Sequence, residues 1–147
     1  MRRLLTLAGV LLAALSAAQL RVATWNISNY TGGRQADLSS SIFDTYQSRS
    51  MRPDIIVTQE FTSQAAQDSF LQMLNSGAFG AVWQAAPFTN GPDTDSAFFY
   101  RSDRVVVVGS QIIVQGGNSP LPPRDVKRYD VVLLGYSAIA PKLAIYS

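Results

Sequence analysis

Two β-rich runs on either side of a helical pattern constrain the fold of this chain most strongly. Residues 20–27 alternate between apolar and polar side chains, which is typical of a strand. Residues 54–60 contain a continuous apolar run, as in a strand that is covered on both faces. Between the two runs, apolar side chains recur every four residues and predict a helix over about residues 37–49. These side chains are Leu38, Ile42 and Tyr46.

The rest of the chain predicts one more helix followed by short strands. Thr62 or Ser63 can cap this helix, and residues 75–77 end it. Its apolar stripe consists of Ala66, Phe70, Met73 and Leu74. Strands are expected over residues 81–86, 96–100, 105–114, 129–136 and 142–146. The pattern predicts an α+β fold in which two helices cover one face of a mixed sheet.

The first 18 residues have the pattern of a secretory signal peptide. Arg2 and Arg3 precede an apolar run, and small residues follow at positions 16–18. The run is shorter than the roughly 20 residues that span a membrane. We therefore expect cleavage before Gln19, a secreted or periplasmic location, and no membrane span in the mature chain. An uncleaved N-terminal anchor is the alternative.

Composition limits the partners and the metals. Cleavage after residue 18 of 147 leaves 129 residues and lowers Lys+Arg from 12 to 10, equal to the 10 Asp+Glu. A formally neutral chain has no overall positive field that favours nucleic acid. The sequence has no Cys and no His. It can therefore form no disulfide, and a metal site must use oxygen ligands, which favours Mg²⁺ or Ca²⁺ over zinc.

Asn26 and Glu60 are the first candidate site residues. Each lies at the C-terminal end of a predicted strand, and Glu60 is the only glutamate in the chain. If the two strands are parallel neighbours, both residues lie at the same sheet edge, where open α/β sheets bind ligands. A carboxylate and an amide there can hold a divalent cation and orient an oxyanion. Alternatively, Glu60 pairs with an arginine and Asn26 satisfies a local turn.

Four segments resemble the endonuclease/exonuclease/phosphatase superfamily, which has the deoxyribonuclease I-like fold. They are "VATWNISNY" (22–30), "PDIIVTQEF" (53–61), "DSAFFYRSDRV" (95–105) and "APKLAIYS" (140–147). The resemblance covers essentially all of residues 19–147, but only the N-terminal half of that family's domain. It implies half of a four-layer α/β-sandwich.

The resemblance also implies roles for particular residues. Asn26 takes the place of the asparagine in the catalytic cleft, and Glu60 that of the glutamate that binds the catalytic Mg²⁺. Basic residues beside the Gly/Pro-rich loop of residues 116–123 are candidates for phosphate contact. Alternatively, they form a solvated charged rim. These are Arg124, Lys127 and Arg128. The implied protein is an exported, Mg²⁺-dependent phosphoesterase with a phosphate-ester substrate, and nucleic acid is among the candidates.

The sequence departs from the family pattern at the general base. It has no His and no Gly-Asp-x-Asn motif, and we expect the second sheet of the sandwich to be missing. We therefore expect an N-terminal portion that is inactive alone. One alternative is a non-catalytic exported binding module that kept the fold, and another is an unrelated secreted protein. Asp93 and Asp95 weakly resemble a calcium cluster, but turn chemistry explains them equally well.

Overall fold

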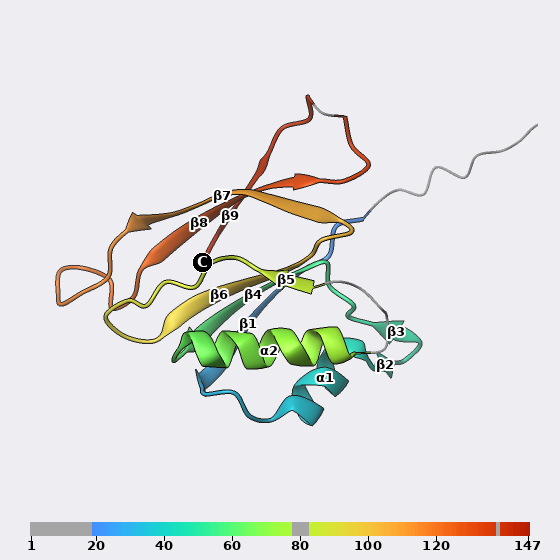
Figure 1. The fold of residues 1–147 in the computed structure, drawn as a ribbon, viewed down its shortest axis with the longest axis horizontal. Coiled ribbons are helices and arrows are strands. Elements are labelled where there is room, and N and C mark those ends of the chain that lie inside the picture. Colours follow the sequence, from blue (N-terminus) through green and yellow to red (C-terminus); the bar gives the residue numbers. More distant parts are fainter. Residues whose placement is uncertain (1–18, 78–82, 138) are drawn as a thin grey trace, which may run out of the picture.

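The computed structural model describes residues 19–77, 83–137 and 139–147 (Figure 1). The predicted signal peptide, residues 1–18, lies outside the described residues. The strands are β1 (Val22–Tyr30), β2 (Thr45–Tyr46), β3 (Arg49–Ser50), β4 (Ile55–Phe61), β5 (Trp83–Ala85), β6 (Asp95–Arg101), β7 (Val105–Val114), β8 (Val126–Leu133) and β9 (Leu143–Tyr146). The helices are α1 (Gln35–Phe43) and α2 (Gln64–Ser76). Within the described parts of the chain, no helix is long and apolar enough to cross a membrane.

The first sheet is mixed, as predicted, with the strand order β1-β4-β6-β5. β1 and β4 are parallel neighbours, and β6 runs antiparallel to both β4 and β5. The apolar run of β4 is buried from Ile55 to Val57, in agreement with a strand that is covered on both faces. The predicted parallel pair is thus present, and it brings the C-terminal ends of β1 and β4 together.

Both helices lie on the same side of this sheet (Figure 1). The Ser63 side chain accepts a hydrogen bond from the Ala66 backbone N–H and caps α2, as the sequence predicts. The predicted stripe of α2 is buried and packs against aromatic side chains of the sheet. Phe70 contacts three of these rings at centroid distances of 4.8–5.8 Å. They belong to Tyr30, Phe61 and Phe99.

A second, three-stranded sheet of order β7-β8-β9 covers the opposite face of the first sheet (Figure 1). A buried cluster fills the space between the sheets, and in it Phe98 stacks on Tyr129 at a centroid distance of 4.3 Å. The described chain therefore has three layers, with helices, mixed sheet and antiparallel sheet in that order. The prediction that the second sheet is missing is therefore wrong. The alternating pattern of β8, with Tyr129 and Val131 buried, places one face of that sheet in the core.

Helix α1 ends six residues before the predicted boundary. The Asp44 backbone N–H donates to Ser40 O, and Asp44 itself is extended. The chain then makes a hairpin between β2 and β3, because Gln47 and Ser48 adopt φ values of 48° and 62° as a tight hairpin turn requires. Tyr46, which the four-residue spacing predicts on the helix face, lies in β2 and is 77% exposed.

Candidate functional site

The parallel pairing of β1 and β4 is interrupted where both strands end. Asn26 pairs with Gln59, but the next pairing joins Tyr30 to Phe61, so residues 27–29 of β1 face only Glu60 of β4. Glu60 adopts a left-handed conformation with φ 66°. Such a conformation is uncommon and costly for a residue other than glycine, and bulges of this kind re-aim a side chain at the edge of a sheet.

Three donors hold the Glu60 carboxylate. Asn26 Nδ2 donates to Oε1 at 2.9 Å, the Asn29 backbone N–H donates to Oε2 at 3.1 Å, and an Arg124 guanidinium nitrogen lies 3.2 Å from Oε1. The orientation of the Asn26 amide is itself set, because its Oδ1 accepts a hydrogen bond from the Ser28 backbone N–H at 2.9 Å. The structure thus brings the two predicted site residues into direct contact.

These contacts keep Glu60 ionised. The hydrogen bond from Asn26 lowers the pKa of the Glu60 carboxyl below its ordinary value of 4.5, and the Asn29 N–H and the positive charge of Arg124 lower it further. Partial burial of the carboxyl acts in the opposite direction but does not outweigh the donors. The end of β4 therefore presents a fixed negative charge at neutral pH.

Of the three basic candidates, only Arg124 lies at this carboxylate. It comes from the loop before β8 and also places Nε 3.5 Å from Asp93 Oδ2, so it links the two carboxylates. Arg128 pairs with Asp130 at 2.8 Å instead. Because Lys127 and Tyr129 are buried between the sheets, Arg128 lies on the opposite, outer face of β8. Sequence reasoning had no signal that separates Arg124 from Arg128.

Lys127 and Asp95 lie inside the sandwich rather than at its edge. They are 2% and 3% exposed, and burial raises the pKa of Asp95 and lowers the pKa of Lys127. Asp95 accepts a hydrogen bond from the Gly91 backbone N–H, whereas Asp93 lies outside with a half-exposed side chain. The weak calcium cluster therefore does not form. Across the described ranges, no group of three Asp or Glu side chains could hold a metal ion.

Glu60 nevertheless fits one position of a hard-cation site. Mg²⁺ prefers oxygen ligands and is commonly bound through one or two carboxylates together with substrate phosphates and water. Glu60 is ionised and oriented, which suits this role. Asn26 turns its Nδ2 to Glu60 and its Oδ1 to the backbone, so it orients the carboxylate rather than acting as a second ligand. This part of the chain can supply one ligand of such a site.

Comparison with known proteins identifies the fold. No protein-family model and no curated protein matches the sequence. Solved structures do match. An endonuclease/exonuclease/phosphatase family protein from Bacteroides thetaiotaomicron aligns with a TM-score of 0.55 and 18% identity, over 86% of this chain and 49% of that chain. The chain has the fold of the endonuclease/exonuclease/phosphatase family.

Two further structures share this fold. A mannosyl-6-phosphatase from Bacteroides thetaiotaomicron aligns with a TM-score of 0.57 and 16% identity, over 87% of this chain and 50% of that chain. TDP2 of D. rerio, solved with a single-stranded DNA product, aligns with a TM-score of 0.50 and 17% identity, over 86% of this chain and 44% of that chain. The chain therefore spans about half the length of the family structures it matches.

Proposed function

We propose that this chain is the N-terminal portion of an exported, divalent-metal-dependent phosphoesterase. The observation that carries the proposal is the ionised Glu60 carboxylate, held by Asn26 at the C-terminal edge of the parallel pair β1 and β4. Ligand sites of open α/β sheets lie at this edge. The fold, which a phosphatase and a DNA-bound protein share, supports hydrolysis of a phosphate ester.

In this proposal each residue has a separate task. Glu60 is the metal ligand, and the Asn26 amide and the Asn29 N–H fix the direction of its carboxylate. Arg124 contacts a phosphate oxygen of the substrate, since its guanidinium already lies beside Glu60 and carries further N–H donors. A bound Mg²⁺ would polarise the phosphate and offset its negative charge.

The proposal requires groups that this sequence lacks. A water molecule that attacks a phosphate ester needs a general base, and the chain has no His for that role. The family structures extend over about twice the length of this chain. We therefore expect residues 19–147 alone not to hydrolyse phosphate esters. Sequencing the coding DNA past the codon for Ser147 would test for an in-frame continuation that supplies a His and a Gly-Asp-x-Asn motif.

Metal binding at Glu60 can be tested on the chain itself. Because Glu60 is the only glutamate, ¹³C-labelled glutamate gives a single side-chain carboxyl signal in an NMR spectrum. We expect added Mg²⁺ to move this signal and Mn²⁺ to broaden it. A signal that neither ion affects would contradict the metal role of Glu60 and favour the non-catalytic binding module.

A matched pair of substitutions controls for unspecific effects of the ion. Mg²⁺ should raise the melting temperature of the unmodified chain and of Asp37→Asn, which removes an exposed carboxylate on α1. The rise should be absent in Glu60→Gln, which keeps the shape of the side chain but not its charge. An equal rise in all three proteins would place the ion elsewhere.

A further inference from the structure

A cluster of arginines lies at the end of the first sheet opposite to Glu60. We name it the arginine cluster, and its members are Arg21, Arg49, Arg52, Arg101 and Arg104. Arg21 precedes β1, whereas Arg101 ends β6. Asp54, at the centre of the cluster, precedes Glu60 by six residues along β4, which corresponds to about 20 Å of extended strand. The arginine cluster is therefore separate from the candidate site at Glu60.

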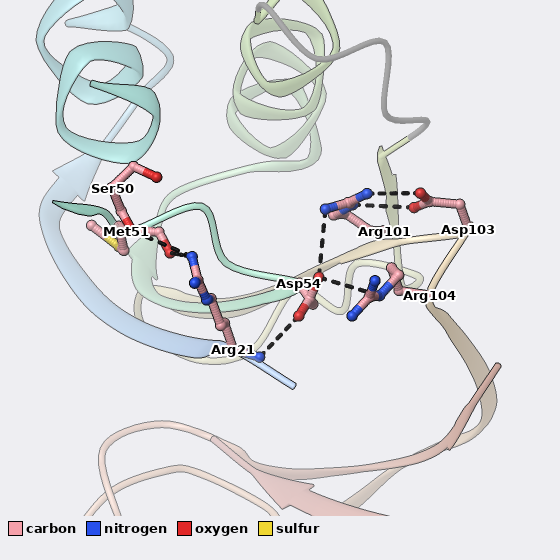
Figure 2. Close-up of polar contacts among 7 residues, drawn as sticks. All are labelled: Arg21, Ser50, Met51, Asp54, Arg101, Asp103 and Arg104. Carbon is pink, nitrogen blue, oxygen red and sulfur yellow. Dashed lines mark hydrogen bonds and ion pairs between the residues drawn. The ribbon is translucent and has the colours of Figure 1, made fainter. Parts of the chain in front are cut away.

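The buried Asp54 organises one half of the cluster (Figure 2). It is 4% exposed, and its Oδ2 accepts a hydrogen bond from the Arg21 backbone N–H at 2.9 Å. Its Oδ1 lies 3.6 Å from a guanidinium nitrogen of Arg101 and 3.8 Å from Nε of Arg104. Both separations exceed an ordinary hydrogen bond. Asp54 thus attracts both guanidinium groups by its charge but accepts no short hydrogen bond from either.

Two cavities adjoin each other along the cluster. One, of about 290 Å³, is lined by arginines and Asp54, and the other, of about 480 Å³, is lined by Ser48, Arg49 and Ser50 together with arginines of the first. Arg21 and Arg52 line both cavities. A ligand with two neighbouring anionic groups could therefore place one group in each cavity, with Arg21 and Arg52 between them.

The charges around these cavities do not balance. The five arginines together with Asp54 and Asp103, which pairs with Arg101 at 2.7 Å, carry a formal net charge of +3. Among the described residues, the guanidinium of Arg49 has no hydrogen bond or ion pair, and that of Arg104 has the long ion pair to Asp54 and the nearby charge of Asp103 but no hydrogen bond. Arg104 is 40% exposed. These two side chains present open donors to a ligand.

We propose that the arginine cluster binds two or more closely spaced phosphate groups. A guanidinium presents a planar set of N–H donors that matches the oxygens of a phosphate, and an excess of three charges suits a polyanion better than a single carboxylate. The phosphates belong either to a free oligophosphate or to the backbone of a nucleic-acid strand. The site does not depend on Glu60 or on the proposed hydrolysis.

The test is a binding titration of the purified full chain with two probes, tripolyphosphate and a single-stranded oligothymidylate. We expect Arg49→Gln/Arg104→Gln to weaken binding of the preferred probe at least tenfold. Affinity for an oligonucleotide falls as salt rises, so the slope of log affinity against log salt is negative. If the oligonucleotide is the preferred probe, loss of two phosphate contacts should make this slope less negative by about 1.4. Tight binding of tripolyphosphate assigns the site to free oligophosphates, and binding of the oligonucleotide alone assigns it to a strand.

Two control variants each remove one positive charge outside the cluster. Lys142→Gln changes an exposed residue before β9, and Arg128→Gln changes the outer face of β8, away from both the cluster and Glu60. Both should bind the preferred probe like the unmodified chain. The proposal is overturned if neither probe binds, if Arg49→Gln/Arg104→Gln binds like the unmodified chain, or if either control loses as much affinity. Circular dichroism of every variant shows whether it is folded. The single variants Arg49→Gln and Arg104→Gln provide a second test if the double variant does not fold.

Discussion

A guanidinium nitrogen of Arg124 lies 3.2 Å from Oε1 of Glu60, across 64 residues of sequence. Arg124 enters from the loop before β8, whereas Glu60 ends β4, so this contact joins the second sheet to the first. The same guanidinium lies 3.5 Å from Asp93. A positive group therefore already lies at the carboxylate that would hold a metal ion, and the two would compete for it or share it.

Removal of this charge should strengthen metal binding. We expect Arg124→Gln to tighten the binding of Mg²⁺ at Glu60 by up to about fivefold, since a partly exposed ion pair contributes at most about 1 kcal/mol. The single ¹³C-glutamate signal reports the affinity. Arg128→Gln, which makes the same change of charge on the outer face of β8, should leave the affinity unchanged. Weaker binding in Arg124→Gln would mean that Arg124 supports the site instead of competing for it.

The hydrogen bond from Asn26 should control the ionisation of Glu60. Asn26→Ala removes the largest cause of the lowered pKa, so the pKa of Glu60 should rise toward its ordinary value of 4.5. Asn26→Asp should raise it further, because a second carboxylate then lies next to the first. A pH titration of the labelled glutamate measures both. An unchanged pKa in Asn26→Ala would show that Asn29 and Arg124 are sufficient to hold the charge.

Glu60 and Asp95 should affect stability in opposite directions when the pH falls. The pKa of Glu60 is lowered in the folded chain, so its stabilising contribution is present above pH 4.5 and is lost on acidification. The pKa of Asp95 is raised by burial, so the folded chain gains stability as this carboxyl takes up a proton. We compare the free energy of unfolding of the unmodified chain with that of each variant. Relative to Glu60→Gln, the unmodified chain should become less stable toward acid pH, and relative to Asp95→Asn it should become more stable. Denaturant unfolding at a series of pH values measures both differences.

The aromatic cluster between α2 and the first sheet should contribute most to the stability of this helix–sheet packing. Phe70 is fully buried against three rings, so Phe70→Ala should lower the free energy of unfolding by about 3–5 kcal/mol. Tyr46→Ala removes a ring that is 77% exposed and should change the free energy by less than about 0.5 kcal/mol. Denaturant unfolding of both variants would test this, and a similar loss in each would contradict the packing described here.

Local sequence patterns predicted most of the elements, because they depend on periodicity and caps. The stripe of α2 and the Ser63 cap follow from residues close together in the chain. The parallel pair that brings Asn26 near Glu60 follows from the order strand, helix, strand. The boundary of α1 was missed because the left-handed Gln47 and Ser48 make a hairpin turn that periodicity does not reveal.

Contacts across long stretches of sequence were beyond local patterns. Nothing near Arg124 distinguishes it from Arg128, yet only the fold brings it to Glu60. The arginine cluster around Asp54 combines three separate parts of the chain, which no motif connects. Packing of the second sheet on the first was missed for the same reason. The contact from the Asn29 backbone N–H to Glu60 had one weak sequence signal. Asparagine tolerates the left-handed conformation better than most residues, and Asn29 adopts it with φ 50°.

The outer face of β7 provides a test of the proposal that the chain is part of a longer domain. Val106 and Val108 are 41% and 46% exposed, and Val114, which lies opposite Val126, is similarly exposed. An apolar sheet face of this kind favours self-association and dye binding unless another layer covers it. We expect the chain ending at Ser147 to bind a hydrophobic dye and to associate, and Val106→Lys/Val108→Lys to reduce both. Tyr46→Lys, an exposed site on the β2–β3 hairpin, should have little effect. A monomeric chain that binds no dye would contradict an uncovered face and favour a self-contained module.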